Sequence, residues 1–341
     1  YPELHVIAAG SLLEFALKNL SSFGVGRVSS LFVYPMSFDE FLTATRQEGL
    51  LRIKRNSSPT NPLPKAFYNR LVEAFRSYML VGGMPEAVAT YTETGSYRYS
   101  SDIVNEIIQG YQDDFAKYGA KANPLLLRQT RISVAHQAGA KFVYSRVEGK
   151  YRSAEVKVAL EMLKDAGLII PTYHTDANGV PLGAEINERV VKYLIHDTGV
   201  LLGILGIDDD IDDSIKEMMV ADSSDLVDKG HVAEMMAGLE LIKYSSPQKR
   251  HQLYYWQNMN KGTCAEVDYV IARSGSIVPI EVKSGVKGSM SSMYSLMRNP
   301  QKHIEMGIRC SLENFGTFES PDGKKIDIIP LYAISNLFAE K

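Results

Sequence analysis

The sequence predicts a multidomain α/β protein, and three observations predict it. The chain has 341 residues, which is too long for one core of typical size. Strand-like and helical patterns alternate along it in blocks of different character. Clusters of glycine and proline, at residues 58–64 and 82–85, interrupt the helical blocks and divide them into pieces.

The first block predicts the end of a larger parallel α/β domain. Residues 4–11 form an apolar run that ends in small residues, which is typical of a buried strand, and a helical pattern follows at residues 12–17. A second strand is predicted from Val28 to Tyr34. One strand–helix–strand unit cannot bury its own faces. Residues 1–38 are therefore expected to be the C-terminal part of a larger core.

Residues 39–207 are predicted to hold a helical lid and then a winged helix. Ser37 and Glu40 have the spacing of a capping box that opens the lid, which we place at residues 39–121. After it, the order helix, turn, helix and β-hairpin indicates a winged helix at residues 122–207. Its expected elements are a helix at 124–138, a helix from Ser153, a strand at 168–170, a hairpin turn at Asn178-Gly179 and a strand at 190–196.

The last block, residues 208–341, has the element order αβββαβ. The acidic run at residues 208–213 is expected to be a solvated linker, because it lacks the Gly and the distal Glu of a calcium loop. The expected elements are a helix at 230–243, strands at 252–257, 265–272 and 277–283, a helical segment at 290–305 and a strand at 326–334.

Composition excludes few functions. The formal net charge of −3 argues against a protein that coats nucleic acid indiscriminately, although one domain can still carry a basic face. Cys264 and Cys310 show no pairing pattern, which predicts free thiols in a cytoplasmic protein. No apolar run is long enough for a membrane span, so no membrane partner is expected. The start at Tyr1 is neither a signal peptide nor an initiator methionine, and we expect the chain to begin partway through a longer protein.

Two carboxylates in the last block have the spacing of a metal site. If Ser274-Gly275 is a two-residue hairpin loop, counting outward places Asp268 directly opposite Glu281, with β-carbons about 4.5 to 5.5 Å apart. Two such carboxylates repel unless a proton or a cation lies between them. Magnesium is the expected cation, because it prefers one or two carboxylates together with water and phosphate oxygens.

Further groups are expected around that pair. Lys283 lies two residues beyond Glu281 on the same face, where an ammonium can position a water or stabilise charge on a phosphate. The carbonyl of Val282 and the side chain of Glu234, on the preceding helix, are candidate further metal ligands, and Glu240 is a rival to Glu234.

Asp268 followed by Glu281-Val282-Lys283, in the order αβββαβ, resembles the PD-(D/E)xK nuclease superfamily. The resemblance implies a restriction-endonuclease-like fold and magnesium-dependent cleavage of phosphodiesters, with Asp268, Glu281 and Lys283 as catalytic residues. Two alternatives stay open. The three side chains form an ordinary cross-strand charge cluster, or the fold is intact and its catalysis is lost.

The whole chain resembles AAA+-type ATPases that carry a C-terminal domain of unknown function 4143. The resemblance runs through the motifs Ala9-Gly10-Ser11, Gly26-Arg27-Val28, Tyr34 to Phe41, Gly82 to Pro85, Asp197-Thr198-Gly199, Glu266-Val267-Asp268 and Lys283-Ser284. It implies that Ser11 senses the γ-phosphate of ATP and that Arg27 faces a phosphate. However, the sequence has no Gly-x-x-x-x-Gly-Lys-Ser/Thr loop, so ATP binding is expected only in a longer protein. In this chain a buried strand end is favoured for Ser11 and a solvated turn for Arg27.

The predicted winged helix carries basic side chains around its second helix, the element that such domains commonly place in a DNA groove. They are Arg146, Lys150, Arg152, Lys157 and Lys164. Phosphate contacts, and hence DNA as a partner, are one interpretation. The other is a joint between proteins with solvated lysines. Two functions therefore remain: a magnesium-dependent nuclease-like module gated by ATP turnover, and a non-enzymatic DNA- or protein-binding switch with a decayed nuclease fold.

Overall fold

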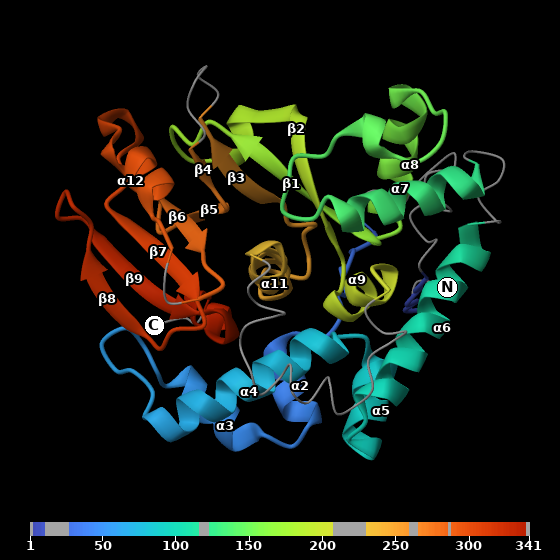
Figure 1. Cartoon of the computed structure of the whole chain (residues 1–341), viewed down its shortest axis with the longest axis horizontal. Coiled ribbons are helices and arrows are strands. Elements are labelled where there is room, and N and C mark those ends of the chain that lie inside the picture. Colours follow the sequence, from blue (N-terminus) through green and yellow to red (C-terminus); the bar gives the residue numbers. More distant parts are fainter. Residues whose placement is uncertain are drawn as a thin grey trace.

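The computed structural model describes residues 3–10, 27–115, 123–206, 230–258, 265–285 and 288–338. Its centre is helix α11 (Gly230–Lys243), seen end-on in the middle of Figure 1. Every residue of α11 from Val232 to Ile242 is buried, because sheets and helices pack around its whole circumference. A helix that is apolar on nearly all sides belongs inside a protein, and here it lies in the larger of two hydrophobic clusters of the described residues. The smaller cluster includes Trp256, Met293 and Leu296.

The N-terminal helices cover one side of α11 (Figure 1). They are α2 (Phe38–Ala44), α3 (Glu48–Arg55), α4 (Lys65–Val81), α5 (Pro85–Thr94) and α6 (Tyr97–Phe115). The predicted capping box opens α2, since the Ser37 amide donates to Glu40 Oε2 at 2.7 Å and the Glu40 amide donates back to the Ser37 hydroxyl. The proline and glycine clusters fall between α3 and α4 and between α4 and α5, as expected of helix breakers. None of the described helices has the length and apolarity needed to cross a membrane.

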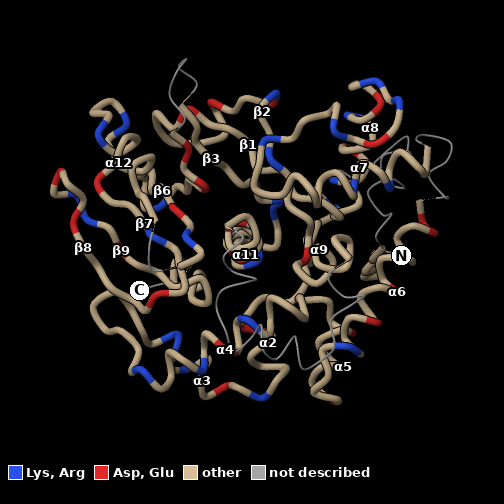
Figure 2. The backbone as a smooth tube through the Cα atoms, in the orientation of Figure 1, with Lys and Arg blue, Asp and Glu red and all other residues tan. Residues whose placement is uncertain are grey.

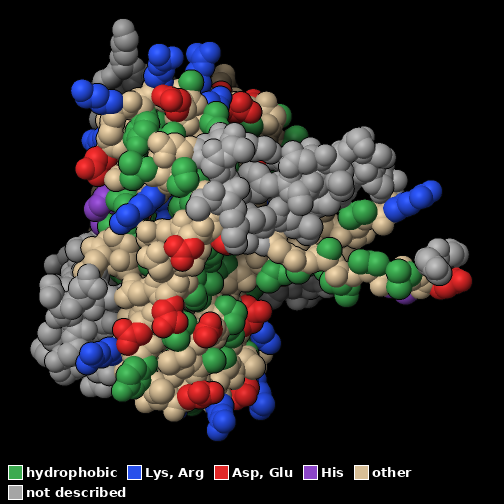
Figure 3. All heavy atoms as spheres, turned by 90° about the vertical axis from the view of Figure 1, so that its right-hand side faces the viewer, with side chains coloured by type: hydrophobic (Ala, Val, Ile, Leu, Met, Phe, Trp, Pro, Cys, Tyr) green, Lys and Arg blue, Asp and Glu red, His purple; other side chains and the backbone are tan. Residues whose placement is uncertain are grey.

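The two strands predicted at the N-terminus are not strands in the described residues. Residues 4–10 and 28–34 do not form strands. The apolar side chains of residues 4–10 are exposed, Ile7 to 97%, and Val33 is 91% exposed, whereas Phe32 and Tyr34 are half-buried. Figure 3 shows hydrophobic side chains along an arm that extends from the body of the molecule, whereas the Phe32 amide donates to the Pro247 carbonyl at 2.8 Å. A strand needs a hydrogen-bonded neighbour, which an apolar run alone does not supply. The helix predicted at residues 12–17, the acidic run at 208–213 and Cys264 lie outside the described residues.

The middle of the chain has the predicted order of two helices and a hairpin. The elements are α7 (Pro124–His136), the 3-10 helix η2 (Tyr144–Arg146), α8 (Ser153–Asp165), β1 (Ile169–Thr175), the 3-10 helix η3 (Leu182–Glu185), β2 (Ile186–Ile195) and α9 (Thr198–Ile204). Strands β1 and β2 are antiparallel, with Ile169 opposite Ile195, and Asn178-Gly179 lies in their connection.

This hairpin also belongs to the sheet of the C-terminal block. Strand β3 (Leu253–Gln257) runs parallel to β1, with Tyr173 opposite Tyr254, and β4 (Glu266–Val267) runs antiparallel to β3. The resulting sheet has the order β2-β1-β3-β4. Two segments that were expected in different domains thus share one sheet.

A second sheet holds the rest of the C-terminal block. Its order is β5 (Tyr269–Arg273), β6 (Ser276–Val282), β7 (Met306–Ser311), β9 (Lys325–Pro330) and β8 (Gly316–Glu319). Helix α12 (Ser291–Arg298) and the 3-10 helix η4 (Pro300–Lys302) connect β6 to the parallel strand β7. In the described residues the block has α11, the four strands β3 to β6, α12 and then the three strands β7 to β9, so the predicted order αβββαβ is found only in part. The strand predicted at 265–272 is divided at Asp268 into β4 and β5, which lie in different sheets, and β7 and β8 were not predicted. The strand predicted at 326–334 ends at Pro330, where the 3-10 helix η5 (Leu331–Leu337) begins.

Asp197 joins α4 to α9. Its side chain caps α9 by accepting from the Val200 amide at 3.1 Å, and it accepts from the Gly83 amide at 2.6 Å. A β-carbon on Gly82 would lie 2.3 Å from Asp197 Oδ1, so only glycine allows this approach. The Gly82 to Pro85 and Asp197-Thr198-Gly199 motifs, distant in the sequence, thus form one structural joint.

Candidate metal and catalytic site

Strands β5 and β6 form the predicted hairpin. Arg273 pairs with Ser276 across the two-residue loop, and Tyr269 pairs with Ile280. Continuing this register places Asp268, in the bend between β4 and β5, opposite Glu281. Asp268 Oδ2 accepts a hydrogen bond of 2.7 Å from the Val282 amide, which fixes its carboxylate against β6.

Glu281 is buried, and in the described structure only one of its two carboxylate oxygens accepts a hydrogen bond. The residue is 5% exposed, and its Oε1 accepts from Lys283 Nζ at 2.6 Å. Its Oε2 is buried with no hydrogen-bond partner among the residues that the structure describes. Burial, reinforced by the charge of Asp268, raises the pKa of Glu281 to about 7, and burial also raises the pKa of Asp268. This pair therefore has the electrostatics of a site that needs a proton or a cation.

Glu234 reaches the same region from α11. The Tyr269 hydroxyl donates to the Glu234 carbonyl at 2.8 Å, which holds α11 against β5. The Glu234 carboxylate accepts from Lys192 Nζ at 2.8 Å, and Lys192 also donates to Glu266 at 2.5 Å. Burial raises the pKa of Glu234 to about 8 in spite of Lys192, and the charge of Asp268 contributes to this rise.

We call Glu234, Glu266, Asp268 and Glu281 the carboxylate cluster. Within the described parts of the chain, no three His, Cys, Asp or Glu side chains converge closely enough to hold one metal ion. Glu234 is engaged by Lys192, so the two carboxylates that fit a cation are Asp268 and Glu281. Carboxylate oxygens are ligands that magnesium prefers, two are sufficient, and the unpartnered Glu281 Oε2 is a donor of this kind.

Glu240, the rival to Glu234, lies on another side of α11. It accepts from the Tyr78 hydroxyl at 2.8 Å and from the Phe38 amide at 3.2 Å. These bonds tie α11 to α4 and α2, so Glu240 is a structural residue.

Three charged residues of this region were not predicted from the sequence: Lys192, Glu266 and Arg309. Arg309 on β7 is the ladder partner of Glu281 and donates to Glu313 at 2.5 Å and to the Gly285 carbonyl at 3.0 Å. A signal for Lys192 was present, because it interrupts the apolar run Val190-Val191-Lys192-Tyr193-Leu194-Ile195, where a lysine has to be buried and paired.

Without a cation, we expect the protein to lose stability as the pH rises from about 5 to about 8. The pKa values of Glu281 and Glu234 are raised in the folded state, so the folded chain keeps protons that the unfolded chain releases in this window. The free energy of unfolding should therefore fall across this window. Urea denaturation in a chelator at several pH values measures it. Glu281→Gln should show a smaller fall, and a rise with pH in the wild type would contradict the expectation.

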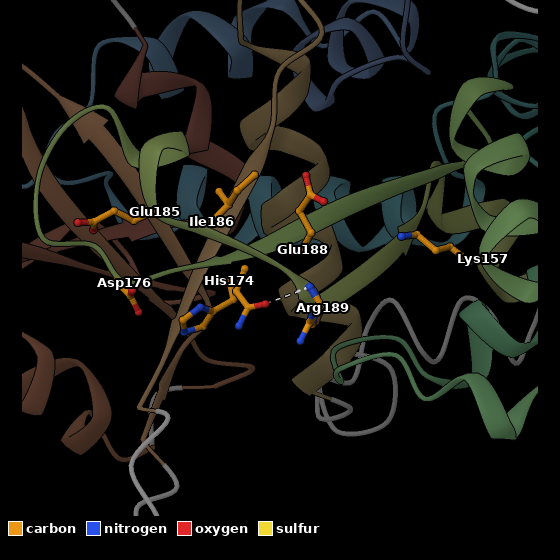
Figure 4. A pocket seen from close by; sticks show the side chains of 8 residues that line it. Lys157, His174, Asp176, Glu185, Ile186, Glu188 and Arg189 are labelled. Carbon is orange, nitrogen blue, oxygen red and sulfur yellow. Dashed lines mark hydrogen bonds between the residues drawn. The ribbon is translucent and has the colours of Figure 1, made fainter. Parts of the chain in front are cut away.

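The basic residues proposed for nucleic acid surround α8 but do not form a uniform surface. Arg146, Arg152 and Lys157 are exposed, whereas Lys164 forms an ion pair with Glu161. Figure 2 shows basic and acidic positions together on α8 and its flanking loop. Lys157 also lines an open groove along the β1–β2 hairpin (Figure 4). The groove is also lined by Arg189 and by three acidic residues, Asp176, Glu185 and Glu188. No residue of the carboxylate cluster lines it.

Of the two residues proposed to face ATP phosphates, the structure describes only Arg27. Ser11 lies outside the described residues, and Arg27 is exposed. The solvated position favoured for Arg27 agrees with this exposure.

Two family models match the chain. Residues 229–334 match a model described as Domain of unknown function (DUF4143), and residues 72–211 match one described as Domain of unknown function (DUF8612). The first contains Glu234, Asp268, Glu281 and Lys283, and the second contains Lys192 and α8. Comparisons with curated proteins and with solved structures found no match.

Proposed function

We propose that the DUF4143 region is a magnesium-dependent phosphodiesterase module of the PD-(D/E)xK type that acts on nucleic acid. The observation that carries the proposal is the pair of half-buried Asp268 and buried Glu281, which the register of one hairpin places opposite each other, with Lys283 in contact with Glu281. Glu281 Oε2 is buried without a partner in the described residues, which would be costly unless a ligand satisfied it.

In this proposal Asp268 and Glu281 hold the magnesium ion, and the Val282 carbonyl is a candidate further ligand. The ion would supply charge neutralisation at the scissile phosphate and would lower the pKa of a bound water. Lys283 is 21% exposed at its side chain, so its ammonium lies between the buried carboxylate and solvent. From there it can orient the attacking water or stabilise the charge that develops on the phosphate.

ATP enters the proposal only through a longer protein. We propose that the chain is part of an AAA+-type ATPase and that ATP turnover in the complete protein controls access to the carboxylate cluster. Ser11 and Arg27 would face the nucleotide there. The 341 residues contain no phosphate-binding loop, so this chain should not hydrolyse ATP by itself.

The second candidate is a non-enzymatic module that binds DNA or protein through a decayed nuclease fold. Burial favours it, because Glu281 and Glu234 are both less than a tenth exposed and Lys192 already neutralises part of the cluster. In this case the cluster is a structural ion network.

Incubation with supercoiled plasmid separates the two candidates. The proposed enzyme nicks plasmid with Mg²⁺ or Mn²⁺, does not nick it in a chelator, and loses the activity in Glu281→Gln. Circular dichroism of that variant shows whether it is folded. An intact plasmid with well-folded wild-type protein and both metals would reject the enzyme and favour the binding module.

If the surface around α8 binds DNA, then Arg152→Ala with Lys157→Ala should weaken binding about 10-fold or more and lower its salt dependence by about two phosphate contacts. Both side chains are exposed, so the fold should be unaffected. Fluorescence anisotropy over a series of salt concentrations measures both effects. The matched control is Lys65→Ala with Arg70→Ala, exposed on α4. Equal loss in the two double variants would show that α8 is not a specific contact surface.

A further inference from the structure

Lys192 is a buried cation that reaches the carboxylate cluster from another part of the chain. It lies on β2, inside the DUF8612 match, and its side chain is 1% exposed. Its ammonium donates to Glu234 on α11 and to Glu266 on β4. It also lies 4.9 Å from the centre of the Tyr255 ring, on β3, which favours a cation at this point.

The charges divide the cluster into two halves. Lys192 forms ion pairs with both Glu234 and Glu266. In the described structure Lys283 forms an ion pair with Glu281, and with no other member of the cluster. Four carboxylates and two ammonium groups leave two negative charges when all are ionised, and one divalent cation balances them. Two divalent cations would leave an excess positive charge in a buried site, where uncompensated charge is costly.

We propose that Lys192 takes the position that a second divalent cation would occupy, between Glu234 and Glu266, so that the cluster binds one cation, at Asp268 and Glu281. Lys192 is thus a positioning residue of the site. The proposal rests on the proposed function in one respect, that a divalent cation binds at Asp268 and Glu281. To that function the proposal adds the number of cations that the cluster binds and the residue that limits this number.

Lys192 and a second cation would compete for the same ligands. A cation between Glu234 and Glu266 needs the carboxylate oxygens that Lys192 holds at 2.8 Å and 2.5 Å. The Lys192 side chain is 1% exposed, so its ammonium cannot turn out to solvent unless β2 moves. Removing the ammonium while keeping a stem of similar volume should open that position to a cation.

The test counts Mn²⁺ ions per folded chain by electron paramagnetic resonance of free Mn²⁺. Wild type should bind one ion and Lys192→Met should bind two, whereas Lys192→Arg should stay at one. Adding Glu266→Gln to Lys192→Met should return the count to one. The control is Lys141→Met. Lys141 is exposed and its backbone forms an isolated β-bridge with Lys192, and this variant should also bind one ion.

Each outcome decides a different claim. Two ions in wild type, or one ion in Lys192→Met with unchanged affinity, would overturn the role of Lys192. No ion in wild type but one in Lys192→Met would support that role and contradict the proposed cation at Asp268 and Glu281. If Lys192→Met unfolds because Glu234 and Glu266 lose the cation that they share, then saturating Mn²⁺ should restore its thermal transition. Failure of Mn²⁺ to restore it would also overturn the proposal.

Discussion

Lys283→Met is expected to lower the rate of phosphodiester cleavage about 100-fold or more while leaving cation affinity equal or higher. The variant removes an ammonium that contacts Glu281 Oε1 at 2.6 Å, so the charge near the scissile phosphate is lost but no metal ligand is. An ammonium also repels a neighbouring cation, and its removal should not weaken cation binding. Single-turnover nicking at saturating Mg²⁺, together with Mn²⁺ affinity, separates the two effects.

The matched control is Lys325→Met on β9, whose ion pair with Asp327 is on the same sheet but not in the carboxylate cluster. It should cleave at the wild-type rate. If Lys283→Met keeps full activity, or if its loss is accounted for entirely by weaker cation binding, then Lys283 does not have the catalytic role that the PD-(D/E)xK resemblance implies.

Asp197→Ala is expected to lower the free energy of unfolding by about 3 kcal/mol. The variant leaves the buried amides of Gly83 and Val200 without the acceptor that they have in the folded protein and removes the cap of α9. It also separates α4 from α9, the joint that Gly82 makes possible by its close approach to Asp197. Equilibrium denaturation with a two-state fit measures the effect.

Asp197→Asn is the informative control for that joint. Its amide oxygen can keep one of the two hydrogen bonds, so we expect a loss of about half that of Asp197→Ala. A loss below about 0.5 kcal/mol in Asp197→Ala would show that water or another group satisfies both amides and that the joint is not held by Asp197.

The carboxylate pair was predictable because its geometry is local. The loop Ser274-Gly275 sets the register of β5 and β6, and a two-residue loop leaves one way to count outward to Asp268 and Glu281. The helix starts were predictable for the same reason: Ser37 and Glu40 lie within one turn. Such features depend on residues a few positions apart, which the sequence displays directly.

Features that depend on distant segments were not predictable in the same way. The parallel pairing of β1 with β3 joins residues about eighty positions apart and leaves no local pattern. No local pattern assigns Glu266 to the site, and only the approach of Lys192 makes it part of the cluster. The apolar runs at residues 4–10 and 28–34 were predicted as strands because periodicity reports a preference for burial, whereas a strand also requires a neighbour.

A cation site at Asp268 and Glu281 is tested by calorimetric titration of Mg²⁺ and Mn²⁺ into wild type, Asp268→Asn and Glu281→Gln. All three chains should be checked for equal folding first. We expect wild type to bind one cation and both variants to lose at least about 10-fold in affinity, because each removes one of two charged ligands. Absence of binding in folded wild-type protein, or equal binding in all three, would contradict the site.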